Sequence, residues 1–347
     1  MPESSRVCVV TVTYGNRFDF LARMVEATVA EGVGRVLIVD NASEPESGNQ
    51  IDELVQSAEG RIVALRLPEN GGSAGGYKAG LEYAAEADYD YFWLLDDDNC
   101  PEPGALAQLL GACTRYEGDT AFLSLRTDRQ QYIAYAKGCS KEACFGRRNS
   151  FLGFALADIP SKVLRRVLGK QLDSTIKPTE KLRPVPVAPY GGLFFPKRLL
   201  HKVGLPRHDF YLYGDDHEFT HRFIQNGVPI FLVPASRVTD IDRSWHVKAD
   251  DQRDYFIHPL VLTAARTDKS MRLYYSVRNR VYLERTALVA QPLLHFCNAL
   301  SYLSMLGLLS LVAAVLKTTL APLSNFGIIM RAVSDAGHNR LGKKALQ

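Results

Sequence analysis

Three adjacent aspartates, Asp96, Asp97 and Asp98, directly follow the apolar run YFWLL at residues 91–95. Neighbouring carboxylates repel one another, and each raises the pKa of the others unless a positive charge compensates. The cluster is therefore either a solvated acidic turn or the binding place of a cation.

A second motif could bind zinc. The sequence HEFTH runs from His217 to His221 and matches the pattern HExxH. On a helix the two histidines would share a face and could bind Zn²⁺, with Glu218 as the general base of a metallopeptidase. This interpretation leaves the aspartate cluster unexplained, and it places the charges of Asp215 and Asp216 beside the zinc helix. The alternative is two surface histidines on an amphipathic helix.

The first third of the chain alternates between strand and helix patterns. Strand-like apolar runs occupy residues 6–14, 35–40, 61–67 and 89–95, with helical patterns between them. This order predicts an α/β fold with a mostly parallel sheet and helices on both of its faces. Ligands of such sheets bind at the carboxyl ends of the strands, and these ends carry the polar clusters TYGN, DNAS, PENGG and DDDN. The aspartate cluster therefore lies at the edge where a ligand is expected.

Further elements follow in the middle of the chain. A tight turn at Gly191 and Gly192 separates a strand pattern from a helix pattern. The stretch after Asp215 predicts a helix that ends at Gly227, and the apolar residues 228–234 predict another strand.

The C-terminal part of the chain has no charged side chain from Thr286 to Leu316. An uncharged run of more than about 20 residues can cross a bilayer, but this run contains scattered polar residues and has basic flanks. A segment lying in the membrane surface, a membrane span and a hairpin of core helices all remain open. We expect a sheet domain over residues 1–268 and a helical, membrane-associated region over residues 269–347.

Composition and failed motif matches exclude several classes of protein. The net charge of +3, without alternating basic and aromatic residues, argues against a nucleic-acid partner. The stretch GGSAGG at residues 71–76 is not followed by the Lys-Ser/Thr of a Walker loop, and we interpret it as a turn that lets backbone approach a ligand. Pro101 and Ala107 break the EF-hand pattern. Six cysteines without a CxxC pair, in a chain whose start shows no secretory signal, predict free thiols in the cytosol.

The order and spacing of several motifs form a family pattern. Between residues 7 and 280 the chain contains VVTVTYGN, VDNAS, NGGSAGGYKAG, WLLDDDN, YGGLFF, YGDDHEFTHR, WH and YYSVRNR. Taken together, these motifs resemble those of glycosyltransferase family 2, which has the GT-A fold. Within that family the chain is most similar to bacterial galactofuranosyltransferases, and related rhamnosyltransferases share much of the pattern.

The resemblance implies a metal and a nucleotide sugar at the aspartate cluster. Asp98, with Asp96, would hold Mn²⁺ or Mg²⁺, whose preferred ligands are hard oxygen atoms. His246 would be the third protein ligand, the alternative being a structural imidazole. Asp96 and Asp97 would also contact the donor, and Asp97 would lie at the ribose or sugar hydroxyls. The other positions that the resemblance places along the nucleotide are Thr13, Tyr14, Asp40, Asn70 and Gly72.

The resemblance also implies a base for the acceptor. An inverting transfer needs a group that takes the proton of the attacking hydroxyl on the face opposite the leaving group. Asp216 matches the position of that base, although an aspartate there could also cap a helix, and Glu218 is the second choice. The acceptor would contact Gly191, Gly192, Asp215 and Trp245.

The resemblance predicts an inverting, metal-dependent glycosyltransferase. The expected donor is UDP-galactofuranose, and the expected acceptor is a lipid-linked glycan of the bacterial envelope. The expected location is the cytoplasmic face of the inner membrane, as a peripheral or monotopic protein. Two alternatives remain open at this point: a rhamnosyltransferase that uses dTDP-rhamnose, and the HExxH zinc metallopeptidase.

Overall fold

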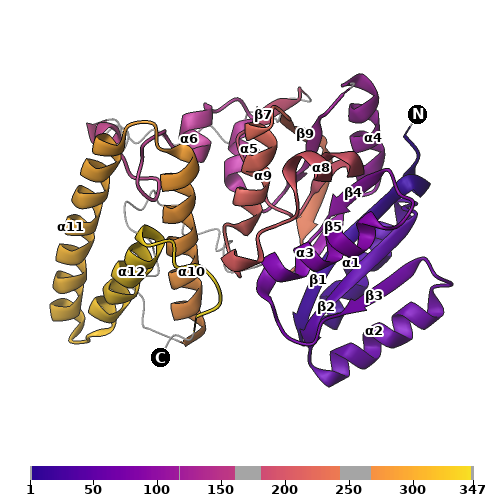
Figure 1. The fold of residues 1–347 in the computed structure, drawn as a ribbon, viewed down its shortest axis with the longest axis horizontal. Coiled ribbons are helices and arrows are strands. Elements are labelled where there is room, and N and C mark those ends of the chain that lie inside the picture. Colours follow the sequence, from indigo (N-terminus) through magenta and orange to yellow (C-terminus); the bar gives the residue numbers. More distant parts are fainter. Residues whose placement is uncertain (1, 117, 161–180, 243–266, 345–347) are drawn as a thin grey trace. The chain divides into compact units, whose positions relative to one another are not determined.

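The computed structural model describes residues 2–116, 118–160, 181–242 and 267–344. The chain divides into two compact units. The first contains the sheet, and the second contains the C-terminal helices together with the segment that begins at Ser140 (Figure 1). All six cysteines are free, as the sequence predicts.

The first half of the sheet is parallel. Four strands lie in the order β3-β2-β1-β4, and each neighbouring pair is parallel. These strands are β1 (Val7–Gly15), β2 (Arg35–Ser43), β3 (Ile62–Arg66) and β4 (Tyr91–Leu94). The helices between them are α1 (Phe18–Ala30), α2 (Pro45–Ser57) and α3 (Gly72–Ala85). The predicted alternation of strand and helix is confirmed for this half.

The second half of the sheet is mixed. It continues from β4 in the order β8-β6-β9-β5, with β7 also paired to β9. Only the β6–β9 pair is parallel here, and the other pairs are antiparallel. The strands are β5 (Asn99–Pro101), β6 (Ala121–Arg126), β7 (Arg183–Val185), β8 (Leu193–Pro196) and β9 (Ile230–Asp240). Because β6 and β8 are buried along their whole length, they read as continuous apolar runs, and such runs do not reveal strand direction.

Helices cover both faces of the sheet, as predicted. Val7 and Val9 of β1 share a core cluster with side chains of α1, α2 and α4 (Ala105–Arg115). The opposite face of β1 meets α3, where a Cβ added at Gly76 would lie 2.5 Å from Val12. The remaining helices of this unit include α5 (Gln130–Ala136), α8 (Leu200–Val203) and α9 (Asp215–Gln225). Gly227 follows α9 with a φ of +74°, which agrees with the predicted helix end.

The second unit is helical. It contains α6 (Lys141–Phe145), α10 (Thr267–Leu283), α11 (Pro292–Lys317) and α12 (Ala321–Gly337), with a π-helical turn at Glu284–Leu288. Figure 1 shows α10, α11 and α12 grouped together, and α12 packs on both of the others. The hydroxyl of Tyr274 on α10 donates a hydrogen bond of 2.6 Å to Asp335 on α12.

One helix of this unit, α11, has two contrasting faces. One face buries Asn298, Tyr302, Leu306 and Ser310. The other exposes large apolar side chains along the whole helix: Leu293, Leu294, Phe296, Leu300, Leu308, Leu311, Val312, Val315 and Leu316. In the described part of the chain, Pro292–Leu316 is the one helix whose length and hydropathy would suffice to cross a membrane, a property that buried helices of soluble proteins can share.

Candidate active site

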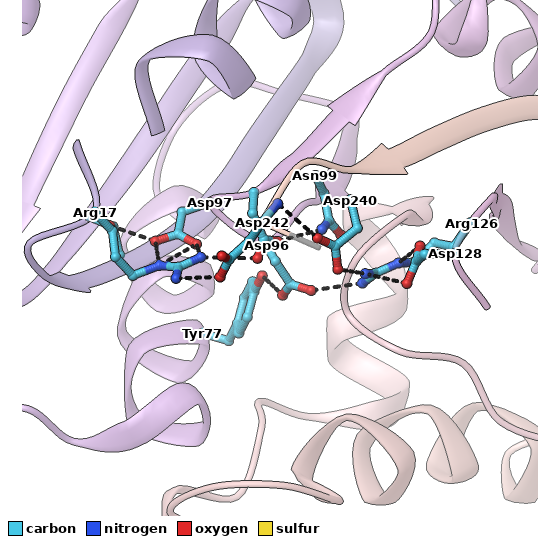
Figure 2. A network of polar contacts seen from close by, with 11 residues as sticks. Arg17, Tyr77, Asp96, Asp97, Asn99, Arg126, Asp128, Asp240 and Asp242 are labelled. Atoms are coloured by element: carbon cyan, nitrogen blue, oxygen red, sulfur yellow. Dashed lines mark hydrogen bonds and ion pairs between the residues drawn. The ribbon is translucent and has the colours of Figure 1, made fainter. Parts of the chain in front are cut away.

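Carboxylates from three strand ends meet at one edge of the sheet in the first unit. Asp96, Asp97 and Asp98 follow β4, Asp128 follows β6, and Asp240 and Asp242 lie at the end of β9. The pairing of β5 with β9 places Asn99 opposite Asp240. Figure 2 shows these groups in one continuous polar network with Arg17 and Arg126. The prediction that polar strand ends gather at one edge is confirmed for this cluster.

Arg17, just before α1, neutralises one side of the cluster. Its guanidinium donates to Asp97 at 2.9 Å, to Asp98 at 3.0 Å and to Asp242 at 2.7 Å. Asp97 also accepts a 2.8 Å hydrogen bond from the hydroxyl of Thr13. Both Asp97 and Thr13 are buried, and their side chains are hydrogen-bonded within the protein.

Arg126, the last residue of β6, neutralises the other side. Its side chain is only 2% exposed, and it contacts Asp96 at 3.0 Å, Asp128 at 3.1 Å and Asp240 at 2.9 Å. Asp96 also accepts a 3.0 Å hydrogen bond from the Tyr77 hydroxyl. With 39% of its side chain exposed, Asp96 is the most open of the three aspartates after β4.

The cluster keeps an excess of negative charge. Ion pairs join its six carboxylates to three guanidinium groups, those of Arg17, Arg126 and Arg129. Burial, and after it the neighbouring carboxylates, first Asp96 and then Asp240, raise the pKa of Asp98 to about 7 against the pull of Arg17. A carboxyl group so placed gains if a cation approaches it.

One further feature suits a cation. The amide of Asn99 donates to Asp98 at 2.7 Å, while its own oxygen Oδ1 is buried without a hydrogen-bond partner among the described residues. A Cβ added at Gly191 would lie 2.0 Å from that oxygen, 2.7 Å from Arg126 Nη1 and 2.8 Å from Asp96 Oδ2, so glycine lets these side chains pack against the backbone. Carboxylate and amide oxygens are the ligand types that Mg²⁺ and Mn²⁺ prefer.

The predicted three-residue metal site cannot be assembled from the described residues. Within the part of the chain that the structure describes, no three His, Cys, Asp or Glu side chains form a ready-made ligand set. His246, the predicted third ligand, and Trp245, the predicted stacking residue, lie outside the described residues.

The other predicted nucleotide positions lie in β1 and β2 and in the segment that follows β3. Tyr14 is 46% exposed. Asp40 is buried, where it pairs with Arg66 at 3.1 Å and accepts a 2.8 Å bond from the amide of Ser43. Asn70 accepts a hydrogen bond from the backbone of Gly72 at 2.9 Å.

Asn41, which the sequence analysis did not single out, holds the start of α3. Its side chain accepts from Gly71 N at 3.0 Å and donates to Gly72 O at 3.0 Å. The sequence signal that could have identified Asn41 was its position directly after Asp40 in the motif VDNAS.

The predicted glycine-rich turn at residues 71–76 is wrong for most of its length, because α3 begins at Gly72. Glycine at position 72 lets α3 pack closely against Tyr211, because a Cβ there would lie 1.9 Å from the carbonyl oxygen of Tyr211.

The second carboxylate pair lies at the start of α9. Asp215 is buried and accepts a 2.9 Å hydrogen bond from Ser73 on α3. Burial, followed by the nearby Asp216 carboxylate, raises the pKa of Asp215 to about 8. Asp216 is partly exposed and accepts a 2.7 Å bond from the backbone N–H of His217.

Two tyrosines that the sequence analysis missed lie between the carboxylate groups. The rings of Tyr77 and Tyr190 have centroids 4.1 Å apart. Tyr77 donates to Asp96, whereas the hydroxyl of Tyr190 is buried without a hydrogen-bond partner among the described residues. The Asp215 and Asp216 carboxylates raise the pKa of Tyr190 beyond the effect of burial, so they lie close to it. The sequence signal that could have identified Tyr190 was its position directly before the Gly191-Gly192 turn.

The HExxH residues have other partners in the structure. Glu218 pairs with Arg222 at 3.1 Å, one helical turn further along α9. Phe219 packs into the core of the unit, and both His217 and His221 are partly exposed. With its carboxylate paired to a guanidinium, Glu218 is a poor general base, so this geometry does not favour a peptidase.

Comparisons with known proteins bear on the family and the fold of this chain. A model of Glycosyl transferase family 2 matches residues 8–153. Galactofuranosyltransferase GlfT1 of Mycolicibacterium smegmatis is 24% identical over 288 residues, which cover 82% of this chain and 84% of that relative. Succinoglycan biosynthesis protein ExoW of Rhizobium meliloti is 28% identical over 123 residues, covering 35% of this chain and 38% of its own.

A solved structure shares the fold. Mannosyltransferase PcManGT of Pyrobaculum calidifontis, in complex with GDP-Man and Mn²⁺, is 14% identical, covers 98% of this chain and 90% of its own, and has a TM-score of 0.53. The family match and the glycosyltransferase relatives support a glycosyltransferase rather than the metallopeptidase interpretation. The chain is a glycosyltransferase with a family 2 domain and a GT-A fold.

Proposed function

We propose that this glycosyltransferase is inverting and metal-dependent, and that it transfers galactofuranose from UDP-galactofuranose to a lipid-linked glycan of a bacterial envelope. One observation carries the reaction type: six carboxylates paired with only three guanidinium groups lie near a second carboxylate pair on α9. The donor sugar is supported by the likeness to a galactofuranosyltransferase over 82% of the chain.

Asp96, Asp98 and Asn99 are the described residues that would hold Mn²⁺ or Mg²⁺, and His246 is the proposed additional ligand. The excess negative charge and the orphaned oxygen of Asn99 both fit a divalent cation. A bound cation would neutralise the negative charge that grows on the leaving diphosphate. The Mn²⁺ in the complex of the mannosyltransferase PcManGT supports this choice of ion.

The chain's own residues would bind the donor from the strand ends. Tyr14, Asn70 and Gly72 would line the nucleotide, and Asp40 would accept hydrogen bonds from the base or ribose. Thr13 would line the nucleotide as well, and Asp97, held by Thr13 and Arg17, would present its remaining carboxylate lone pairs to the ribose or sugar hydroxyls. The support is their common position at the carboxyl ends of the parallel strands, where ligands of such sheets bind.

Asp216 would act as the general base. Asp215, with a pKa of about 8, keeps its proton at neutral pH and accepts a bond from Ser73, so it suits an orienting role rather than proton removal. Asp216 is the exposed member of the pair and can reach an acceptor hydroxyl. Gly191 and Gly192 would let the acceptor approach the backbone, and Trp245 would stack on a sugar ring.

The exposed apolar face of α11 supports a membrane partner. Nine large apolar side chains lie uncovered along this helix, and basic residues precede and follow it in the sequence. A helix with one apolar face and basic neighbours suits the boundary between headgroups and acyl chains. We place the enzyme at the cytoplasmic face of the bacterial inner membrane, because nucleotide sugars are made in the cytosol.

A panel of nucleotide sugars tests this proposal. Purified enzyme with Mn²⁺ should bind and consume UDP-galactofuranose in preference to dTDP-rhamnose, UDP-galactose and GDP-mannose. Asp216→Asn should retain donor binding and lose about a hundredfold or more in turnover, the scale of losing a general base. Glu218→Gln is the matched control on the same helix, because it removes a carboxylate that is already paired with Arg222. A larger loss in Glu218→Gln than in Asp216→Asn would show that the base is wrongly assigned.

A further inference from the structure

The backbone just before α9 adopts an unusual conformation. Tyr211, Tyr213 and Gly214 have φ angles of +65°, +63° and +74°. For a non-glycine residue a positive φ is unfavourable, and such residues persist only where their surroundings determine the conformation. The turn leads directly into Asp215 and Asp216, so whatever holds it also sets where these two carboxylates start.

The side chain of Asn279 binds this turn within the second unit. The amide nitrogen of Asn279, on α10, donates to the carbonyl oxygen of Leu212 at 2.9 Å and to that of Tyr213 at 2.7 Å. Asn279 is fully buried. A Cβ added at Gly214 would lie 3.3 Å from the Cβ of Asn279, so the turn and α10 pack closely at this point.

A buried arginine fixes the amide of Asn279. Arg278 Nε donates to Asn279 Oδ1 at 2.8 Å, which orients the amide nitrogen toward the turn. Arg278 is also fully buried, lies 4.7 Å from the ring centroid of Tyr275, and donates to the carbonyl oxygen of Gly342 at 2.7 Å. The guanidinium is planar and makes several directed bonds, so it holds the amide in one orientation.

We propose that Asn279 is a positioning residue for glycosyl transfer. By binding the two carbonyl groups of the turn, it fixes the chain from which α9 starts, and thereby the place of the Asp216 carboxylate. The reacting groups of an enzyme must be held within a fraction of an ångström, and a misplacement of about 1 Å can cost a hundredfold in rate. The proposal rests on the proposed role of Asp216 as the base. It assigns to α10 a part in catalysis although Asn279 itself touches no substrate.

The test compares Asn279→Ala with Asn298→Ala in the full-length enzyme. Asn298 is a matched control because it is also buried in the second unit and bonded to backbone, donating to Asn149 O at 2.8 Å and accepting from Leu156 N at 3.0 Å. Both variants should lose similar thermal stability, because each loses a buried amide. Asn279→Ala should lose tenfold or more in kcat with an unchanged KM for the donor, whereas Asn298→Ala should keep kcat within twofold. Equal kcat values for the two folded variants would overturn the proposal.

A second measurement separates this proposal from that for the base. Hydrogen exchange of peptides covering residues 211–222 should become faster in Asn279→Ala and stay unchanged in Asn298→Ala. If Asp216→Asn kept its turnover, the assignment of the base would fail, while the exchange result would still report whether Asn279 holds the turn. If Asn279→Ala did not fold, Asn279→Ser, which can still donate one hydrogen bond, should show an intermediate kcat. Wild-type exchange and wild-type kcat in that variant would overturn the proposal.

Discussion

Substitutions at two glycines of α3 can test how closely this helix packs against the turn before α9. A Cβ at Gly72 would lie 1.9 Å from the backbone oxygen of Tyr211, and Gly72 has a φ of +71°. A Cβ at Gly75, three residues along, would meet nothing within 4 Å. Both substitutions to alanine add the same methyl group to the same helix, so their difference isolates the contact and the backbone conformation at Gly72.

The expected cost at Gly72 follows from two separate effects. Alanine in the left-handed region costs roughly 1–2 kcal/mol, and forcing a methyl group into a packed site costs roughly 1–3 kcal/mol. Gly72→Ala should therefore lower the free energy of unfolding by about 2–5 kcal/mol. Gly75→Ala should raise it by about 0.5–1 kcal/mol, because alanine favours the helix over glycine.

Urea unfolding at neutral pH measures this difference. The two variants should differ in midpoint with similar slopes, since neither changes much of the surface exposed on unfolding. Because Ala74 N also donates to Tyr211 O at 3.2 Å, movement of this oxygen should spread to the turn before α9, and kcat should fall in Gly72→Ala but not in Gly75→Ala. Unfolding midpoints that agree within error would refute this account of the glycine.

Two further predictions concern the carboxylates. Asp98→Ala should abolish the difference in donor affinity that the wild type shows with Mn²⁺ and with EDTA, measured by calorimetry; equal wild-type affinities under both conditions would contradict a metal bridge to the diphosphate. Asp215 has a pKa raised from 3.8 to about 8, so the folded state holds its proton over this range while the unfolded state releases it. The Asp215 contribution therefore makes stability fall as pH rises from about 4 to about 8, and Asp215→Asn should flatten the dependence of Tm on pH; an identical slope in both proteins would argue against the raised pKa.

The order of the first elements was predictable because each physical signal was local. The apolar strand runs, the helical patterns between them and the polar strand ends each fall within a short window. The edge at which Asp96 and Asp98 lie follows from the parallel order alone. The direction of β8 and β6 was not predictable, since fully buried strands read alike in parallel and antiparallel pairs. The requirement for glycine at position 72 was not predictable either, because the packing that demands it comes from Tyr211, far along the chain.

The arginines of the site were missed, although the sequence held a signal for one of them. Arg126 ends the apolar run AFLSLR, and a buried arginine requires carboxylate partners. Three aspartates at one strand end and an arginine at the end of another should therefore have been matched to each other. Arg17 carries no such signal, because its partners Asp97 and Asp242 lie 80 and 225 residues away.

These two arginines also explain how so many carboxylates can lie side by side. Each guanidinium contacts three carboxylates, so neither can neutralise all of its partners. What they supply is fixed geometry, since a planar group with several donors holds each carboxylate in place. Asp98 keeps a pKa raised to about 7 despite Arg17, and beside it the oxygen Oδ1 of Asn99 has no hydrogen-bond partner in the described part of the chain. An arrangement that is rigid yet under-neutralised would suit a divalent cation, and this is why the excess charge, rather than the mere presence of three aspartates, supports the proposal of metal-dependent transfer.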